Sequence, residues 1–565
     1  MGVFSPDALK YYKALSYKKC SEKPLLTKVI KEHNVARVVI DMKSPDASNI
    51  TCCYSNVIRK KSKKSPDNTI EISDCKNFQH NVTITTTAIM VKCKHNSSSK
   101  MVYENVHTTY LIDDKVKKKM IKYNNTRPLS VLLIGIDSIS RLNFARSLPK
   151  TLKYIEERKW ISLKGYNKMD DNTFPNLMAI LTGFNDSMVF KTYNPKAIGN
   201  LDKCPMLWYK YRDLGYVTAY AEDSASMSTF NYIKKGFVKP PTDYYFRPYV
   251  MATEKLKKVS VHRLYYCTGP ENAGERILNL ADEFANTFKD YPNFGFFWMN
   301  SFSHNNLNTP SMMDNRLRKF LIDLEDDHIY NNSLVIFLSD HGMRFGDIRR
   351  TPTGWQEERL PFIHFLFPPW FEEKYPKLLQ NLRGNTNKLT TPYDLHMTLQ
   401  HLLVLSGFNY TIKPSDACPQ CMSLLEDIPQ DRSCKEAGIV DHWCTCEGYI
   451  EHKFESNILK KINTYFMEKL GNIISSTAEG NKCVKYKIKS TSTRISERFV
   501  NKTGNHIVLS ITTDPLAEFE TTITYDGNLS VNSTLTIGDI SRLDYYAPHS
   551  KCITDAYLKK YCYCK

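Results

Sequence analysis

The sequence lacks the long apolar segments that span membranes. Its 565 residues contain no uninterrupted apolar run of the roughly 18 residues that a transmembrane helix requires. The start of the chain, residues 1–19, also has neither the apolar stretch nor the small-residue cleavage site of a secretory signal peptide. Because apolar residues make up 42% of the composition, there is ample material for a core, and a wholly disordered protein is excluded.

Cysteine is scarce in the middle of the chain. Of the 16 cysteines, Cys204 and Cys267 alone lie between residues 94 and 417, whereas five precede this stretch and nine follow it. Outer regions stapled by disulfides around a cysteine-poor core are typical of an oxidising compartment. The even count permits full pairing, although the connectivity cannot be deduced from the sequence.

Ten Asn-x-Ser/Thr sequons agree with that compartment. The sequence therefore predicts an extracellular or secretory-pathway protein whose signal peptide is missing from this chain. The alternative, which the leaderless start favours, is a protein that is not secreted. The sequons begin at Asn49, Asn81, Asn96, Asn124, Asn185, Asn331, Asn409, Asn501, Asn528 and Asn532.

Basic residues outnumber acidic ones, 77 to 59, which gives a net charge of +18. This surplus favours an anionic partner or substrate, such as a small molecule, a lipid or a glycan. Two basic clusters, at residues 59–64 and 115–119, could indicate nucleic-acid binding, but no recognition-helix or aromatic RNA-platform motif accompanies them. We interpret the clusters as solvated loops and expect no nucleic-acid partner.

From Pro128 onward, continuous apolar runs alternate with helical patterns. Such runs fill strands that are buried on both faces, and their alternation with helices predicts an α/β fold with a largely parallel sheet. The predicted strands cover residues 130–136, 216–221, 294–299, 333–338 and 360–367, and the predicted helices cover residues 174–181, 312–324 and 392–405.

The same patterns predict three regions. Residues 1–127 form a cysteine-rich, β-leaning region with runs such as Asn81–Met90, and residues 128–410 form the α/β domain. Residues 411–565 form a second cysteine-rich module of the α+β class. In this module the periodicity predicts a helix over residues 454–474 and strands over residues 506–513, 519–525 and 529–537.

Four of the predicted strands in the α/β domain end in side chains that can bind a metal or transfer a proton. In an open α/β sheet the working residues lie just past the carboxyl ends of the strands. Strand ends are often polar, so one such residue means little, but the repetition at one end of a sheet indicates a site. The side chains are Asp137, Asp223, Asn300, His304, Asp340 and His341.

A hydroxyl group joins them in the segment Asp171-Asn172-Thr173-Phe174-Pro175-Asn176. Pro175 suits a first helical turn, and Asn172 or Thr173 would cap the helix. Thr173 would then lie where helix N–H groups bind anions, and a hydroxyl beside a divalent metal can attack phosphorus or sulfur. The alternative is an ordinary helix cap.

Together these motifs resemble the alkaline phosphatase/sulfatase superfamily, and within it an animal branch catalogued as domain of unknown function 229. The resemblance spans about residues 128–407 and rests on the order and spacing of the motifs. It implies an α/β core with helices on both faces of the sheet, and one metal ion held by Asp137, Thr173, Asp340 and His341, with Thr173 as the nucleophile. Zinc suits this ligand set, and manganese is compatible with it. The motifs are GIDSISR, DNTFPNLMAILTG, NSFSHN, LSDHGMRFGDIR, EERLPF and TPYDLHMTLQHLL.

The second metal of some superfamily members is where this sequence departs from the pattern. His304 matches one ligand, but Asn300 stands where those members carry Asp. His364 and His396 are candidates for a further ligand, although each lies in an apolar pattern that favours a core histidine. We therefore expect one tight site, with His304 binding substrate or protonating a leaving group. Asp223 and His304 remain candidates for a second metal, and Asn300, Arg141 and Arg344 for substrate binding.

The resemblance implies a hydrolase or transferase acting on phosphate esters. Sulfatases use Cys-x-Pro-x-Arg with the cysteine oxidised to formylglycine, whereas this chain has Thr173-Phe174-Pro175-Asn176-Leu177. Threonine cannot give that aldehyde, so sulfate-ester hydrolysis by the standard route is not expected. The alternative is a catalytically weak or inactive relative that binds anionic glycans or lipid head groups.

Overall fold

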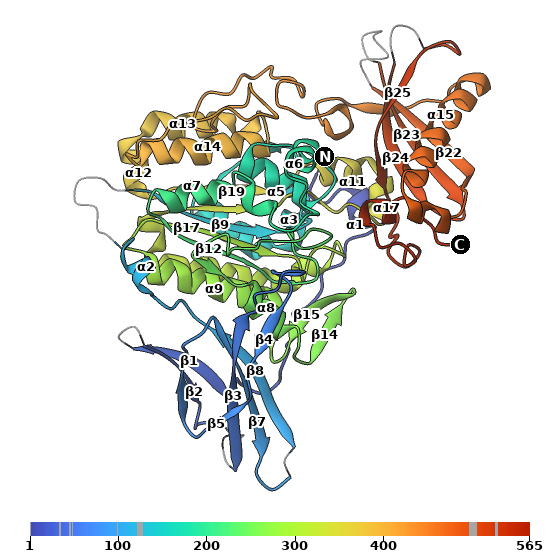
Figure 1. Cartoon of the computed structure of the whole chain (residues 1–565). Helices are drawn as coiled ribbons and strands as arrows, with labels where there is room; N and C mark the ends of the chain where they lie inside the picture. Colours follow the sequence, from blue (N-terminus) through green and yellow to red (C-terminus); the bar gives the residue numbers. More distant parts are fainter. Residues whose placement is uncertain are drawn as a thin grey trace.

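The structure is a computed structural model that describes residues 2–32, 35–44, 47, 49–98, 100–120, 128–496, 505–525 and 529–565. A central α/β layer lies between a lower β-rich region and a C-terminal module (Figure 1). Among the described residues, none of the helices combines the length and the apolar character that a membrane crossing requires. The sequons at Asn124, Asn501 and Asn528 lie outside the described residues.

A seven-stranded sheet forms the centre of the α/β layer. Its central strand β9 is parallel to both of its neighbours, β17 and β18, and β12 and β13 continue the parallel part. At the other edge β19 is antiparallel to both β18 and β10. The prediction of a largely parallel sheet is thus confirmed. In spatial order the strands are β10 (Ile161–Ser162), β19 (Ile363–Leu366), β18 (Ser333–Leu338), β9 (Ser130–Ile136), β17 (Asn293–Met299), β12 (Val217–Glu222) and β13 (Tyr244–Tyr245).

Both faces of this sheet are covered by helices, because the apolar run of β9 sends alternate side chains to opposite sides. Leu132 and Ile134 join one core cluster, and Val131 and Leu133 join the other. The first face carries α2 (Asp114–Lys117), α3 (Arg141–Ser147), α4 (Pro149–Glu157), α8 (Arg247–Thr253), α9 (Ala273–Phe288) and α10 (Asp314–Asp326). The second carries α5 (Thr173–Thr182), α6 (Asp186–Tyr193), α7 (Leu207–Asp213), α12 (Pro369–Lys374), α13 (Pro376–Gly384) and α14 (Pro392–Leu405).

The lower region contains two antiparallel sheets. The run Asn81–Met90, predicted as one β segment, is split: β6 pairs with β2 in one sheet, and β7 pairs with β3 in the other. The strands are β1 (Thr27–Glu32), β2 (Val35–Ile40) and β6 (Asn81–Thr83) in one sheet, and β3 (Ile50–Arg59), β4 (Ile70–Ile72), β5 (Lys76–Phe78), β7 (Ala88–His95) and β8 (Met101–Thr108) in the other.

Seven disulfides account for fourteen of the sixteen cysteines. Of the other two, Cys204 is buried and Cys446 is exposed. Cys20–Cys267 ties the segment before β1 to the central layer across 247 residues. Before it, α1 (Pro6–Leu9) packs against α11 (Pro352–Arg359). Two small sheets, β11 (Gly165–Tyr166) with β20 (Leu389–Thr390) and β14 (Lys258–Val261) with β15 (Leu264–Thr268) and β16 (Glu271–Asn272), complete this part.

The C-terminal module, residues 449–565, packs a long helix on a five-stranded antiparallel sheet. The helical spacing of this segment places Ile458, Ile462, Phe466 and Leu470 on one face, and in α15 the last three are buried whereas Ile458 is half-buried. The predicted last strand begins later than expected, since residues 529–534 precede β25. The elements are β21 (Tyr449–Glu451), α15 (Ser456–Ser475), β22 (Lys487–Ser496), β23 (His506–Asp514), β24 (Glu518–Tyr525), β25 (Leu535–Arg542) and α17 (Ala556–Lys559).

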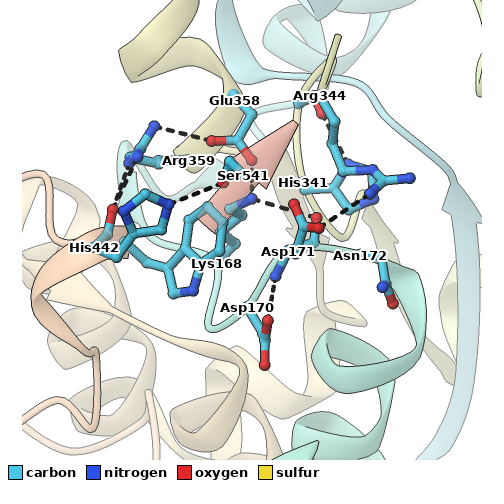
Figure 2. A network of polar contacts seen from close by, with 12 residues as sticks. Lys168, Asp170, Asp171, Asn172, His341, Arg344, Glu358, Arg359, His442 and Ser541 are labelled. Carbon is cyan, nitrogen blue, oxygen red and sulfur yellow. Dashed lines mark hydrogen bonds and ion pairs between the residues drawn. The ribbon is translucent and has the colours of Figure 1, made fainter. Parts of the chain in front are cut away.

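A buried ion network joins the module to the α/β layer. Glu520 of β24 lies 3.3 Å from Arg359, 3.6 Å from Arg349 and 2.8 Å from Arg494. Arg359 also pairs with Glu358 at 3.0 Å, and Glu358 is hydrogen-bonded to the buried Lys168 (Figure 2). The run Glu357-Glu358-Arg359 before β19 therefore has a structural role in this network of opposite charges.

Because Glu520 is buried among three arginines, its loss should destabilise the protein strongly. We expect Glu520→Gln to lower the free energy of unfolding by about 3 kcal/mol or more, since it leaves buried cations uncompensated. Glu372→Gln is the control, because Glu372 pairs with Arg383 at 2.7 Å and both side chains are about half exposed. That change should cost less than about 1 kcal/mol. Equal losses in urea unfolding would contradict the role assigned to Glu520.

Candidate active site

Asp137, Asp340 and His341 meet at the carboxyl ends of β9 and β18. Their ligand atoms all lie within 4.8 Å of one another, and all three side chains are buried. His341 Nε2 is 3.6 Å from Asp137 Oδ1 and 3.1 Å from Asp340 Oδ2. The parallel pairing of β9 with β18 brings these residues together, although about 200 positions separate them in the chain.

Local hydrogen bonds orient each of these side chains and leave one atom of each unused. Ser138 Oγ donates to Asp137 Oδ1 at 2.8 Å, and the amides of Ser138 and His341 donate to Asp340 Oδ1. His341 Nδ1 donates to the Gly342 carbonyl at 2.8 Å, so Nε2 carries the lone pair. Asp137 Oδ2, Asp340 Oδ2 and His341 Nε2 have no hydrogen-bond partner among the described residues. Three converging acceptor atoms without donors fit a bound cation.

The backbone around these ligands is tightly constrained. A Cβ atom on Gly342 would lie 2.2 Å from the Glu357 carbonyl oxygen, so only glycine fits between the His341 loop and α11. Ser138 adopts a left-handed φ of 64°, which places both its amide and its hydroxyl on the carboxylates. Such local strain persists where the surrounding contacts fix it.

The protonation properties of Asp137, Asp340 and His341 also favour a bound cation. Burial raises the pKa of Asp137 to about 7, and burial together with the neighbouring Asp137 raises the pKa of Asp340 to about 8. Burial lowers the pKa of His341 well below its usual range, which keeps its ring neutral. Two carboxylates and a neutral imidazole form an oxygen and nitrogen ligand set that suits zinc, and manganese is compatible with it.

Thr173 begins helix α5 beside this cluster, and together with Asp137 it lines the cavity described below. The cap residue is Asn172, whose side chain makes no capping hydrogen bond within the described chain, so the first amides of α5 are open to an anion. The fully buried Asn176 fixes the preceding loop instead. Its Nδ2 donates to the carbonyls of Asp170 and Asn172, and its Oδ1 accepts from the Met169 amide at 2.7 Å.

His304 faces the same cluster from the loop after β17. Its Nε2 lies 3.9 Å from Asp137 Oδ2, and its Nδ1 donates to Asn305 Oδ1 at 2.7 Å. Burial, and then the Arg344 cation, lowers the pKa of His304 to about 4. The neutral ring therefore presents a lone pair toward Asp137.

Asn300 and Asp223 form hydrogen bonds with each other rather than with Asp137, Asp340 or His341. Asp223 Oδ1 accepts from the Asn300 amide at 2.7 Å, and Asp223 Oδ2 accepts from the Ser301 amide at 2.9 Å. Arg141 begins α3, where burial lowers its pKa. None of the three predicted residues lines the cavity described below.

His364 and His396 are core residues. His364 Nδ1 lies 2.6 Å from Ser162 Oγ, and His396 Nδ1 donates to the Ile180 carbonyl at 2.9 Å. Burial lowers their pKa values to about 3 and about 4, respectively. Neither belongs to the Asp137 cluster or to the cavity lining.

A cavity of about 560 Å³ opens over the cluster and is lined by Asp137, Thr173 and His304. Its wall also contains Arg344, one of the predicted candidates for substrate binding, and residues to which the sequence patterns gave no role. Figure 2 shows Asp171 between Lys168 and Arg344. The C-terminal module adds Tyr545, Tyr546 and Lys560. No motif marks these three residues, since their role depends on how the module packs.

Comparison with known proteins places the chain in a family. The chain matches the sequence model of the family described as "Protein of unknown function (DUF229)" over residues 13–492. No curated protein sequence matches it.

The solved structures that are similar to the chain include three at low identity. The lipoteichoic acid synthase LtaP from Listeria monocytogenes is 12% identical, with a TM-score of 0.37 over 71% of this chain and 91% of that one. A protein in the alkaline phosphatase superfamily from Vibrio parahaemolyticus is 12% identical, with a TM-score of 0.38 over 75% and 90%. The C-terminal periplasmic domain of phosphoethanolamine transferase EptC from Campylobacter jejuni is 14% identical, with a TM-score of 0.34 over 54% and 95%. Scores of this size carry no conclusion about activity.

The assigned ligands predict where metal affinity resides. Asp340→Ala and His341→Ala should each weaken metal binding by at least about 100-fold, because each removes one of the converging acceptor atoms. His396→Asn is the control, since His396 lies outside the cluster and should leave the metal content unchanged. Metal content is measured on the purified, dialysed protein. Full occupancy in either ligand variant would show that the metal is held elsewhere.

Proposed function

The chain belongs to the DUF229 family, and on that premise we propose that it is a secreted, metal-dependent hydrolase or transferase of phosphate esters with Thr173 as nucleophile. The observation that carries the proposal is the position of the Thr173 hydroxyl. It lines the same cavity as Asp137, one of three buried residues whose unpartnered acceptor atoms converge.

In the proposed reaction the Thr173 hydroxyl gives up its proton to solvent and its Oγ atom attacks phosphorus, and the bond from phosphorus to the ester oxygen breaks with the electron pair staying on that oxygen. The leaving oxygen takes a proton, and the phosphoryl group then passes from Thr173 to water or to an acceptor alcohol. A divalent ion held by Asp137, Asp340, His341 and Thr173 would favour the ionised hydroxyl and neutralise phosphoryl oxygens. The open amides at the start of α5 and the Arg344 guanidinium offer donors for the remaining oxygens.

His304 is the proposed proton donor to the leaving group. Its ring is neutral in the free protein, because burial and Arg344 lower its pKa to about 4. An anionic ester beside the ring adds negative charge and raises its proton affinity. His304 can then hold a proton at Nε2, the atom that faces Asp137.

Phosphate rather than sulfate is the proposed ester. Position 173 is threonine, which cannot be oxidised to the formylglycine aldehyde. The second candidate function is a weak or inactive relative that binds anionic glycans or lipid head groups, and the net charge of +18 favours it. Turnover, rather than binding, separates the two functions.

The proposed location of the protein is extracellular. Seven disulfides spread over the lower region, the segment after α14 and the C-terminal module suit an oxidising compartment. An extracellular phosphate-ester enzyme with this net charge would meet anionic small molecules, lipids or glycans as substrates.

Thr173→Ala tests the nucleophile directly. Because Asn172 is the cap residue of α5, the change should cost less than about 1 kcal/mol of stability. Turnover of phosphate esters should nevertheless fall by roughly 1,000-fold or more, since the attacking oxygen is gone.

Thr173→Ser should keep part of the activity, because it retains a hydroxyl group. Metal content and melting temperature of both variants serve as controls. A Thr173→Ala variant as active as the parent would refute the mechanism, and a parent with no turnover but tight phosphate binding would support the binding alternative.

A further inference from the structure

The cleft over the metal ligands is built from two distant parts of the chain. One wall comes from the α/β layer, with Thr173 and Arg344, and the other from the C-terminal module, with Tyr545 and Lys560. The two walls are in direct contact, because the ring centroids of Phe345 and Tyr545 lie 5.4 Å apart. The active site is therefore complete only when the module is docked.

Lys560 makes a short polar contact across this boundary, inside the cleft. Its Nζ lies 2.7 Å from Asp171 Oδ2, and the disulfides Cys483–Cys562 and Cys552–Cys564 hold the segment that carries it. Asp171 precedes the Thr173 nucleophile by two positions. A cation from the end of the fold thus reaches the loop that positions the proposed nucleophile.

The same carboxylate oxygen also attracts Arg344, but more weakly. The Arg344 NH1 atom is 3.5 Å from Asp171 Oδ2, beyond a tight charged hydrogen bond, and Arg344 Nε has no partner among the described residues. Two cations therefore share one carboxylate, and Lys560 takes the closer place. The guanidinium keeps unused donors beside the cavity that contains Asp137 and His304.

We infer that Lys560 is a positioning residue, which occupies Asp171 and so keeps the Arg344 guanidinium available for the anionic group of the substrate. This inference rests on the proposed function for the identity of that group. Without Lys560, Asp171 would draw Arg344 into a close, bidentate pair, the geometry that arginine and carboxylate groups favour. The C-terminal module would then act on anion binding through Arg344 and not through direct contact.

Lys560→Met tests this arrangement, with Lys559→Met as the matched control. Lys559 is the neighbouring lysine and is not among the residues that line the cleft. The readouts are the Kd for inorganic phosphate, KM and kcat with an aryl phosphate, metal content and melting temperature. Lys560→Met should raise Kd and KM by about tenfold, the effect of losing a hydrogen bond to a charged group, with a smaller change in kcat. Lys560→Arg should restore most of the affinity.

A second background distinguishes positioning from a merely structural role. In Asp171→Asn protein the carboxylate that pairs with Arg344 is gone, so adding Lys560→Met should have little further effect on phosphate affinity. An equal penalty in both backgrounds, or none in Lys560→Met alone, would overturn the inference. Phosphate binding needs no turnover, so a parent that binds phosphate without hydrolysing esters fails the proposed function but still tests Lys560. A parent that does not bind phosphate overturns this inference as well.

Discussion

Two buried carboxylates, Asp137 and Asp340, point toward the neutral ring of His341, and the arrangement of the catalytic layer depends on that convergence. Each side chain has one atom anchored by a neighbouring amide, hydroxyl or carbonyl and one atom left over. Buried acceptors without donors are unfavourable unless a cation satisfies them. The glycine at position 342 and the left-handed Ser138 are features of the backbone that bring these atoms together.

The sequence predicts this centre well because a parallel sheet converts strand order into proximity. The runs at 130–136 and 333–338 coincide with β9 and β18, and their pairing places Asp137 beside Asp340. Continuous apolar runs specify strands that are buried on both faces, so few alternatives compete. The helix boundary at Thr173 was predictable for a similar reason, since polar residues and Pro175 mark the start of an otherwise apolar helix.

Contacts between regions could not be predicted in the same way. Lys560 lies 389 positions from Asp171, and Glu520 lies 161 positions from Arg359. Neither pair has a periodicity or a motif that reports its distance. The run Asn81–Met90 looks continuous in sequence, yet it serves two sheets because β6 and β7 find different partners. Asp223 and Asn300 lie at strand ends as expected, but their mutual hydrogen bonds direct them away from the cavity.

The distribution of charge also determines what must happen before an anionic ester can bind. With Asp137 and Asp340 both ionised, each would repel a phosphate charge at about 4 Å by about 4 kcal/mol at an effective dielectric constant of about 20. Arg344 and Lys560 offset this repulsion only in part, because both are already shared with Asp171. The carboxylates must therefore be neutralised where they converge, by protons or by a divalent ion. Only a divalent ion leaves Thr173 beside a positive centre. The proposed chemistry therefore requires the metal ligands and the cationic side chains of the protein to act at separate places in one cleft.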